Sequence, residues 1–377
     1  MKKTIIFLVC LSLFVCASFS ALAKENENPV QAKSAILMCM DTGDVLYKEN
    51  EYEHLSPASV TKIMTILLVL EALDSNKITL EDKVTASEEA VSMGGSQIWL
   101  EKGETMTVNE LMKAVVIASA NDACTALAEY VGGSTTGFVK MMNDRAAELG
   151  LENTHFENSN GLDDTVSNHY SCAYDLAVIT CEVMKHTLIK DYTTIWLDSL
   201  RNGETELNNT NKLVNTYNGI TGLKTGTTSN AGFCVSATAE RDSLNLVAVV
   251  LGSDTSEHRF DAASYLLDWG FANYEVITPE IDNKQINSID VNMGEIKKIK
   301  PVYKDSAKIC INKSDSDITY KYEIPKEINA PVKKGDKIGE ISVLNGGNII
   351  GSIALVSPDN IAKVTLGSIF SYILLKI

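Results

Sequence analysis

Ser59 and Lys62 combine two reactive side chains at the start of a long apolar-periodic segment. On a helix, residues three apart share a face, so the hydroxyl and the amine are expected within hydrogen-bonding distance. The start of a helix adds free N–H groups and the positive end of the helix dipole. This arrangement predicts a serine nucleophile activated by a lysine base. A Ser-x-x-Lys pattern alone is weak, because a solvated pair on a helix surface fits it equally well.

Two further short motifs follow along the chain. Ser119-Ala120-Asn121 lies between two apolar helical patterns, and Lys224-Thr225-Gly226 precedes a strand-like run. Each motif alone is consistent with an ordinary turn. The three motifs together are far more specific than any one of them. They occur in the order Ser-x-x-Lys, Ser-x-Asn, Lys-Thr-Gly, with separations of 60 residues from Ser59 to Ser119 and 105 from Ser119 to Lys224.

The combination resembles the low-molecular-mass penicillin-binding proteins, which are serine-type D-alanyl-D-alanine carboxypeptidases. The resemblance covers residues 34 to about 275, and it extends to both chain ends and the β-rich C-terminal part. Supporting matches are the segments 59–65 and 222–228 and the tripeptides Asn160-Gly161-Leu162 and Ala231-Gly232-Phe233. The fold implied is a β-lactamase/DD-peptidase-like domain of the α/β (α+β) class, with an antiparallel sheet and a helical subdomain.

The resemblance implies catalytic roles for four residues. Ser59 resembles the nucleophile that attacks the carbonyl of the penultimate D-Ala, and Lys62 resembles the base that takes its proton. Ser119 resembles a proton relay to the leaving amine, and Asn121 a ligand of the substrate amide. The oxyanion is expected at the backbone N–H groups of Ser59 and Thr227.

The third motif is implied in substrate binding. Lys224, Thr225, Gly226 and Thr227 resemble the segment that holds the substrate's terminal carboxylate beside a sheet edge. Arg259 aligns, by spacing, with an arginine that supports the same carboxylate. Many relatives carry His where this chain has Thr227, which leaves the pH dependence and the rate of deacylation open.

The implied reaction is acyl transfer in two steps that uses no metal and no organic cofactor. Peptidoglycan stem peptides ending in D-Ala-D-Ala are the expected substrates, in peptidoglycan biosynthesis and remodelling, and β-lactams are expected to acylate the same serine. The five histidines are scattered and form no His-Glu-x-x-His motif, which disfavours a zinc hydrolase.

Three alternatives remain open at this point. A serine β-lactamase shares the three motifs and uses a loop glutamate for deacylation; Glu152 and Glu157 lie in about the right region, although Leu-Asn follows neither at that family's spacing. A non-catalytic penicillin-binding sensor or scaffold is the second alternative. Endopeptidase action on cross-links, which needs the same machinery, is the third.

The elements that must position these residues are indicated by hydrophobic periodicity. A strand over 34–40 and a return strand from 45 predict a hairpin, and an apolar helix follows Ser56-Pro57-Ala58 to about Leu73. Strands at both ends of the segment, with helices between them, predict one α/β domain. The other expected elements are helices over 105–131, 135–149, 171–190 and 259–272 and strands over 231–239 and 244–252.

Both chain ends have their own character. Residues 1–23 predict a secretory signal peptide, with Lys2-Lys3, an apolar region and Ala21-Leu22-Ala23. Residues 24–275 are the expected catalytic domain and 276–358 a small all-β domain. Residues 359–377 carry an apolar stripe that predicts an amphipathic, membrane-anchoring helix, with packing on the protein's own core as the alternative. The expected location is the extracytoplasmic face of the membrane.

Composition limits the partners. The chain has 377 residues and a formal charge of −16, which disfavours nucleic acid. Residues 24–275 carry −20 and residues 276–377 carry +2, which supports a boundary near 275. After the signal peptide six cysteines remain, for which disulfides and buried thiols are both open: Cys39, Cys124, Cys172, Cys181, Cys234 and Cys310.

Overall fold

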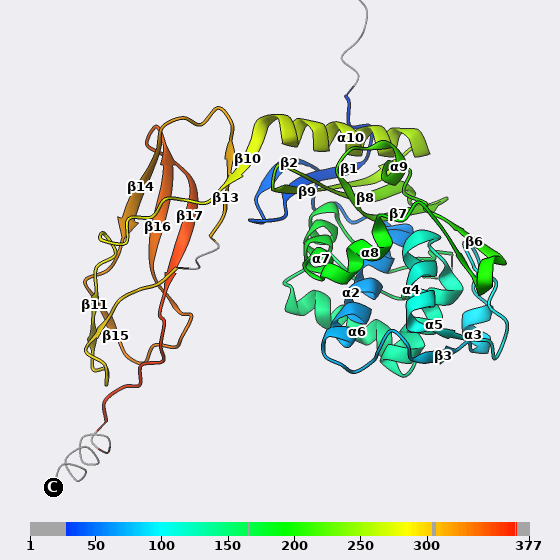
Figure 1. Cartoon of the computed structure of the whole chain (residues 1–377), viewed down its shortest axis with the longest axis horizontal. Coiled ribbons are helices and arrows are strands. Elements are labelled where there is room, and N and C mark those ends of the chain that lie inside the picture. The colour runs from blue at the N-terminus through cyan, green and yellow to red at the C-terminus, as the bar shows by residue number, and fades with distance from the viewer. Residues whose placement is uncertain (1–27, 165, 304–306, 366, 368–377) are drawn as a thin grey trace, which may run out of the picture.

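The structure is a computed structural model that describes residues 28–164, 166–303, 307–365 and 367. The expected signal peptide and nearly all of the expected tail helix lie outside these residues. Within the described residues, no helix is long and apolar enough to cross a membrane. Figure 1 shows a larger α/β part and an elongated β part, joined where helix α10 leads into strand β10.

The α/β part is built on one five-stranded antiparallel sheet. The expected hairpin at 34–49 supplies two strands, and a later segment supplies the other three. This confirms that both ends of the segment build the sheet. In spatial order the strands are β2 (Val45–Glu49), β1 (Ser34–Cys39), β9 (Leu244–Ser253), β8 (Gly232–Arg241) and β7 (Ile220–Thr228).

Side-chain alternation on the strands divides the apolar core in two. On β1, Ile36 and Met38 pack toward the helical subdomain, whereas Ala35, Leu37 and Cys39 pack toward α10. Successive side chains of a strand point to opposite faces, so a central strand buried on both faces must be apolar throughout. The sheet therefore lies between two helical layers.

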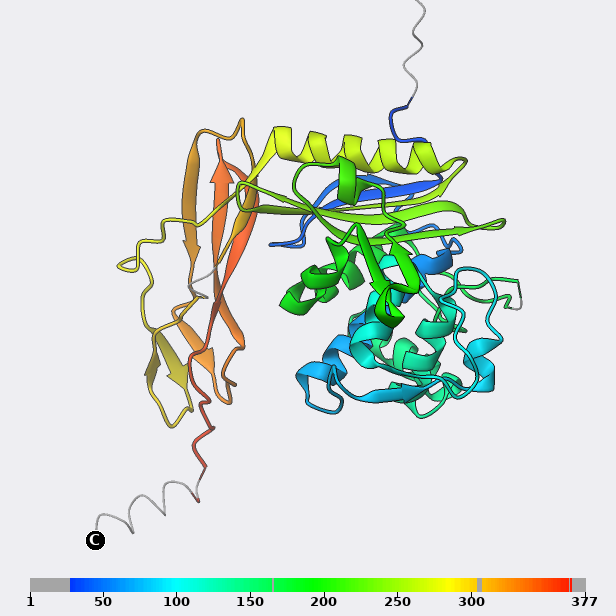
Figure 2. The same ribbon diagram turned by 45° about the vertical axis from the view of Figure 1, so that its right-hand side comes forward.

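Helix α10 (Ser256–Asn273) covers one face of the sheet, and the helical subdomain covers the other (Figures 1 and 2). The α10 layer comes from the expected helix at 259–272. The helices of the subdomain and its connections are α2 (Lys62–Asp74), α3 (Glu88–Val91), α4 (Val108–Ile117), α5 (Asn121–Gly132), α6 (Thr135–Glu148), α7 (Ala173–Lys185), α8 (Lys190–Thr193) and α9 (Leu213–Thr216).

Several boundaries differ from the sequence-based expectation. The expected helix over 105–131 begins with strand β4 (Thr105–Thr107), which pairs with β3 (Lys83–Thr85), and is broken between α4 and α5. The Thr107–Glu110 capping box starts α4 instead. The expected helix over 171–190 ends at Lys185. Two strands, β5 (Leu197–Leu200) and β6 (Thr205–Asn208), form a hairpin that the polar sequence did not indicate.

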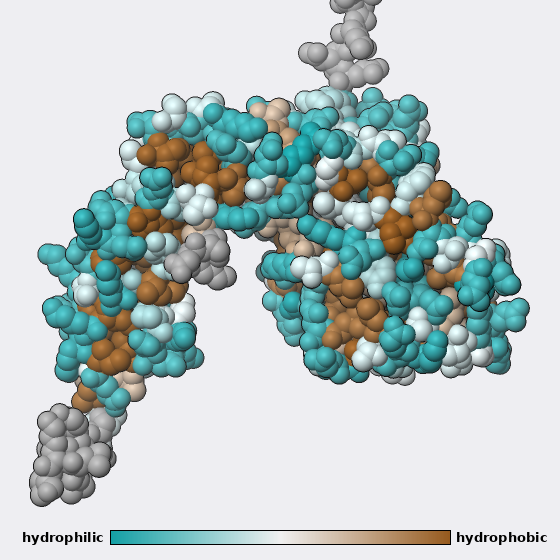
Figure 3. Space-filling view, viewed as in Figure 1, coloured by the Kyte–Doolittle hydropathy of each residue, from teal (hydrophilic) through white to brown (hydrophobic). Residues whose placement is uncertain are grey.

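The C-terminal part is all-β, as expected. It packs around two small apolar cores. In Figure 3 its visible face is mixed, with hydrophobic residues lying between hydrophilic ones. Its strands are β10 (Tyr274–Ile277), β11 (Ile289–Asn292), β12 (Lys298–Ile299), β13 (Ile309–Asn312), β14 (Ile318–Glu323), β15 (Glu327–Asn329), β16 (Lys337–Asn345) and β17 (Asn348–Val356).

Strand β13 brings the C-terminal part against the catalytic sheet. Cys310 on β13 packs in the same apolar cluster as Cys39 on β1, and Lys308 Nζ lies 2.5 Å from Asp41 Oδ1. All six described cysteines are free thiols, so the disulfide option is not realised in this structure.

Candidate active site

The predicted nucleophile lies on a tight turn immediately before α2. Ser59 belongs to the 3-10 turn η1 (Ala58–Thr61), and Lys62 is the first residue of α2. Ala58 has φ +46°, an unfavourable conformation for a residue with a Cβ, and it is fully buried. The turn is therefore held by its surroundings rather than by local preference.

Lys62 is fully buried and has three polar partners. Its Nζ lies 2.8 Å from Ser59 Oγ, 2.5 Å from Asn121 Oδ1 and 2.8 Å from the carbonyl oxygen of Asn160. Burial disfavours the charged amine and lowers the pKa of Lys62 to about 8. About a tenth of Lys62 is therefore neutral at pH 7, and about half at pH 8.

The partners of Lys62 suit a neutral amine. The oxygens of Asn121 and Asn160 can only accept, so they match the two N–H donors of an –NH₂ group. Lys62 Nζ donates to Ser59 Oγ in the structure; once the amine is neutral, the Ser59 hydroxyl can donate instead to the nitrogen lone pair. The geometry therefore allows the Ser59 proton to pass directly to Lys62.

The Asn160-Gly161-Leu162 segment packs directly under the nucleophile turn. A Cβ on Gly161 would lie 1.8 Å from the carbonyl oxygen of Ala58, and Gly161 has φ +83°. Only glycine fits both restrictions. This close approach brings the Asn160 carbonyl to Lys62.

A buried histidine also supports the turn. The His169 Nδ1 accepts from the Glu157 backbone N–H at 3.0 Å, which leaves Nε2–H to donate to Thr61 Oγ1 at 2.8 Å. Burial lowers the pKa of His169 to about 4, so the ring is neutral near pH 7. Sequence reasoning did not identify His169, because an isolated histidine carries no spacing signal.

The Ser-x-Asn motif lies at the break between α4 and α5. Asn121 begins α5, and its side-chain amide has two partners: Oδ1 faces Lys62, and Nδ2 donates one N–H to the Gly94 carbonyl at 2.6 Å. Ser119 is buried with φ +62°. Within the described part of the chain, no hydrogen bond joins the Ser119 side chain to Lys62 or Lys224.

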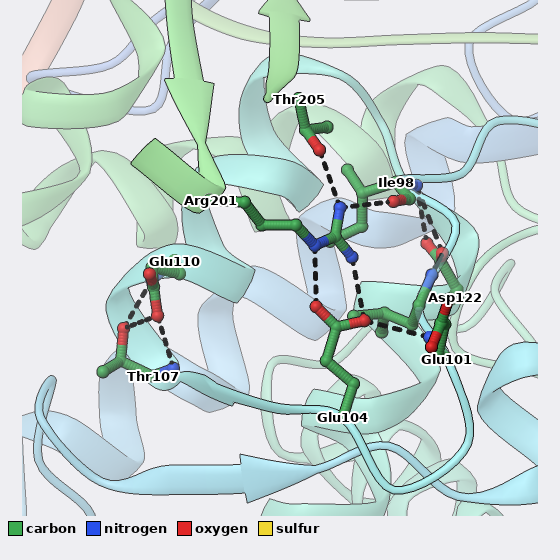
Figure 4. Close-up of polar contacts among 9 residues, drawn as sticks. Ile98, Glu101, Glu104, Thr107, Glu110, Asp122, Arg201 and Thr205 are labelled. Carbon is green, nitrogen blue, oxygen red and sulfur yellow. Dashed lines mark hydrogen bonds and ion pairs between the residues drawn. The ribbon is translucent and has the colours of Figure 1, made fainter. Parts of the chain in front are cut away.

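A polar network holds the segment that faces Asn121 (Figure 4). The buried Asp122 carboxylate accepts from the backbone N–H groups of Ile98 and Leu100, at 3.0 to 3.2 Å. Arg201, just after β5, donates to the Ile98 carbonyl at 2.8 Å and forms a two-point ion pair with Glu104 at 2.7 and 3.0 Å. The β5–β6 hairpin is thereby tied to the segment around residue 98.

The Lys-Thr-Gly motif lies on β7, the edge strand of the sheet, which the sequence analysis did not identify as a strand. A Cβ on Gly226 would lie 2.7 Å from the Pro57 carbonyl oxygen and 2.9 Å from the Ser59 nitrogen. Glycine at this position therefore lets the edge strand touch the nucleophile turn. The Thr225 hydroxyl donates to Thr210 Oγ1 at 2.7 Å.

Arg259 reaches this strand from α10. Its Nη1 donates to the Gly226 carbonyl at 2.9 Å, to Thr227 Oγ1 at 3.0 Å and to the Cys234 carbonyl at 3.2 Å, and its Nε is buried without a partner. Burial lowers its pKa to about 10. The placement of Arg259 beside the third motif agrees with the expectation from spacing.

Lys224 completes a group of three buried basic side chains with Lys62 and Arg259. Lys224 is fully buried, and burial, followed by the charges of Lys62 and Arg259, lowers its pKa well below the usual value. No ion pair among the described residues includes any of the three cations. Buried positive charge without a carboxylate partner favours an anionic ligand.

Glu157, one of the two glutamates considered for the β-lactamase alternative, is engaged elsewhere. Glu157 Oε2 accepts from the backbone N–H groups of Ser167 and Asn168, at 3.0 and 2.8 Å. Its carboxylate therefore holds the loop between Glu157 and Asn168.

The fold and the site define a class of protein: a five-stranded sheet flanked by helices, in which a serine just before a helix contacts a buried lysine and lies beside a sheet edge with two further buried basic side chains. A family model described as D-alanyl-D-alanine carboxypeptidase matches residues 21–255. A second, described as the C-terminal domain of penicillin-binding protein 5, matches residues 274–363. The chain belongs to the D-alanyl-D-alanine carboxypeptidase family.

Individual relatives agree over nearly the whole chain. D-alanyl-D-alanine carboxypeptidase DacF of Bacillus subtilis is 39% identical, covering 96% of this chain and 95% of the relative. The crystal structure of penicillin-binding protein 5 from Haemophilus influenzae aligns with a TM-score of 0.79 and 30% identity, covering 90% and 100% of the two chains.

An ampicillin-bound penicillin-binding protein of Listeria monocytogenes aligns with a TM-score of 0.60 and 30% identity, covering 66% of this chain and 100% of its own. These findings identify a serine-type D-Ala-D-Ala carboxypeptidase with a penicillin-binding fold and an all-β C-terminal domain. The β-lactamase alternative is not favoured, because the relatives are named as carboxypeptidases and penicillin-binding proteins.

Proposed function

We propose that Ser59 is the nucleophile and Lys62 the general base. Ser59 Oγ attacks the carbonyl carbon of the penultimate D-Ala as its proton passes to the Lys62 nitrogen, 2.8 Å away. Lys62 acts in this way only in its neutral form, which its lowered pKa of about 8 supplies. The result is a tetrahedral intermediate bonded to Ser59.

The sheet edge is proposed to bind the substrate's terminal carboxylate. Arg259 supplies positive charge, and the bound carboxylate stabilises the charged form of Lys224, whose pKa is otherwise lowered by burial. The hydroxyls of Thr225 and Thr227 donate to Thr210 Oγ1 and to the Gly226 carbonyl in this structure and turn to the ligand when it binds. Charge-assisted hydrogen bonds are roughly twice as strong as neutral ones, and these cations have no internal carboxylate to compete with the ligand. Gly226 contributes the close approach of the strand to Ser59.

Completion of the cycle uses the remaining motif residues. The backbone N–H groups of Ser59 and Thr227 are proposed to hold the oxyanion. Ser119 relays a proton to the departing D-Ala amine, and Asn121 binds the substrate amide. Water then hydrolyses the ester at Ser59.

The contact between Ser59 and Lys62, a buried amine that forms no ion pair among the described residues, is the observation that carries this proposal. The test is mass-spectrometric mapping of the penicillin adduct, with D-Ala release from a pentapeptide measured in parallel. We expect the adduct on Ser59, and Ser59→Ala to lose both labelling and D-Ala release. An adduct on another residue would refute the assignment, and labelling without any D-Ala release would favour a sensor or scaffold.

We also propose that the protein is exported and acts on peptidoglycan at the extracytoplasmic face of the membrane. The support is the basic, apolar and Ala-x-Ala pattern of residues 1–23 and the apolar stripe of residues 359–377. N-terminal sequencing of the mature protein should begin at Lys24. Truncation after Pro358 should release it from membranes, and unchanged fractionation would contradict anchoring by the tail.

A further inference from the structure

Trp99 is an aromatic side chain that the fold holds out in solvent. It is 74% exposed, although Ile98 and Leu100 on either side are buried in the helical core. Its φ of +57° lies in the left-handed region, which is unfavourable for a bulky residue. The backbone at Trp99 therefore adopts an energetically unfavourable conformation, which directs the indole outward between two buried neighbours.

Hydrogen bonds on both sides of Trp99 maintain this conformation (Figure 4). The N–H groups of Ile98 and Leu100 both donate to the carboxylate of Asp122, which is completely buried. The Ile98 carbonyl accepts from Arg201, which is itself held by Glu104. Trp99 thus projects from a segment that is already ordered, so a ligand that contacts it would pay little entropy to fix it.

The indole has no aromatic or cationic partner within the described residues. Trp269, by contrast, packs edge-on against Tyr47 and Tyr274. Trp99 makes no such contact. An exposed ring without such a partner, carried on a backbone that hydrogen bonds hold, is a platform on which a flat apolar surface can pack.

The segment that carries Trp99 also contacts the catalytic motif. The Asn121 backbone N–H donates to the Ser96 carbonyl at 2.7 Å, and the Asn121 side chain lies 2.5 Å from Lys62 Nζ. Three residues of extended chain span at most about 10 Å, which bounds the backbone distance from Ser96 to Trp99. Four residues of a stem peptide span about 13 to 14 Å between the reacting D-Ala and the sugar that carries the stem. The first length covers only the Ser96–Trp99 step, and Ser59 is reached from Ser96 through Asn121 and Lys62.

From this geometry, and resting on the proposed function, we propose that Trp99 binds the carbohydrate of glycan-linked stem peptides by stacking against the C–H face of a pyranose ring. The sugar ring offers the flat, apolar and uncharged surface that a fixed indole prefers, whereas its hydroxyl edges remain in water. The reacting D-Ala-D-Ala end stays at Ser59, and Trp99 adds affinity only when the glycan is present.

The test compares one pentapeptide stem with and without its attached disaccharide, using the full-length protein and measuring KM and kcat for D-Ala release. An aromatic contact is worth about 0.5 to 1.5 kcal/mol. Trp99→Ala should therefore raise the KM of the disaccharide-linked stem, relative to that of the bare stem, by about 3- to 10-fold. Trp99→Tyr should restore most of the difference.

Met293→Ala is the matched control. Met293 is also apolar, 58% exposed and at positive φ (+56°), but it lies in the C-terminal part. It should leave the KM ratio unchanged. An equal rise in KM for both stems, which would indicate a peptide contact, or no rise for either would overturn the proposal. Failure of the proposed function would be distinct, because the wild-type protein would then release no D-Ala from either stem.

Discussion

Two regions meet at the active site, and each contains a fully buried lysine. The nucleophile side, formed by η1, α2 and the start of α5, gives Lys62 three oxygen partners, one of which is Ser59 Oγ. The sheet side, formed by β7 and α10, gives Lys224 a single backbone carbonyl, that of Thr225 at 3.1 Å, and places Arg259 beside the same strand. Burial lowers the pKa of both lysines. Because both lysines are buried, their different partners are what assign Lys62 the role of a base and Lys224 that of an anion-binding group.

The largest expected effect comes from substituting the base. Lys62→Arg keeps the positive charge, but a guanidinium does not lose its proton at accessible pH. We expect the rate of acylation by a fluorescent penicillin to fall about 1,000-fold, within the range of general-base catalysis. The measurement is the time course of labelling.

Lys224→Arg is the matched substitution on the sheet side. A site that needs charge rather than proton transfer should tolerate it better, so its loss should be at least tenfold smaller than that of Lys62→Arg. Equal losses at the two positions would contradict the division of roles. Circular dichroism of both variants checks that they are folded.

A change in pH should act on the nucleophile side through His169. The folded-state pKa of His169 is about 4, below the ordinary 6.5, so its contribution to stability is complete above pH 6.5 and is lost as the pH falls toward 4. The loss amounts to roughly 3 kcal/mol. Urea unfolding of wild type and His169→Gln between these pH values measures it. We expect the wild type to lose more stability than the variant, and parallel curves would contradict the assignment.

On the sheet side, Arg259→Gln should weaken recognition of the substrate carboxylate. A hydrogen bond to a charged group is worth about 1.5 to 3 kcal/mol, so KM should rise about 10- to 100-fold. The rise should appear for a peptide ending in a free carboxylate and be much smaller for the same peptide ending in an amide. Equal effects on the two peptides would indicate a structural role for Arg259.

The smallest expected effect is at the contact between the two sides. Gly226→Ala places a Cβ 2.7 Å from the Pro57 carbonyl oxygen, so β7 and the nucleophile turn must separate. We expect a loss of about 1 to 3 kcal/mol in unfolding free energy. Gly94→Ala, whose Cβ would meet open space, is the control. An unchanged unfolding free energy in Gly226→Ala would show that the close contact between β7 and the nucleophile turn does not contribute to stability.

The chemistry could be predicted from the sequence because it is carried by short motifs with fixed spacing. Ser59 and Lys62 are three residues apart, and that separation alone predicted their contact. The strands of the 34–49 hairpin and of 232–253 were predicted because they are short apolar runs bounded by turn residues. Roles implied by family resemblance, such as those of Ser119 and Thr227, stay predictions.

The rest depends on contacts between distant segments. Residues 222–226 of strand β7 are all buried, because both faces of the strand are covered. Their sequence does not alternate between apolar and polar residues, and it includes Lys224, so no strand pattern could be recognised. The Asn160 carbonyl, a partner of Lys62, is a backbone group that no side-chain pattern reveals. Asp122 adjoins a recognised motif, yet its role depends on the amides of Ile98 and Leu100, more than 20 residues earlier. These features follow from tertiary packing, which periodicity does not report.

The central claim is that Lys62 activates Ser59 in its neutral form. The most direct measurement is the pH dependence of the pre-steady-state rate of Ser59 acylation by penicillin, from about pH 6 to pH 10. Because the pKa of Lys62 is about 8, the neutral fraction grows as the pH rises, so the rate should increase through pH 8 and level off above it. A rate that is constant or falls over the same range would contradict the account.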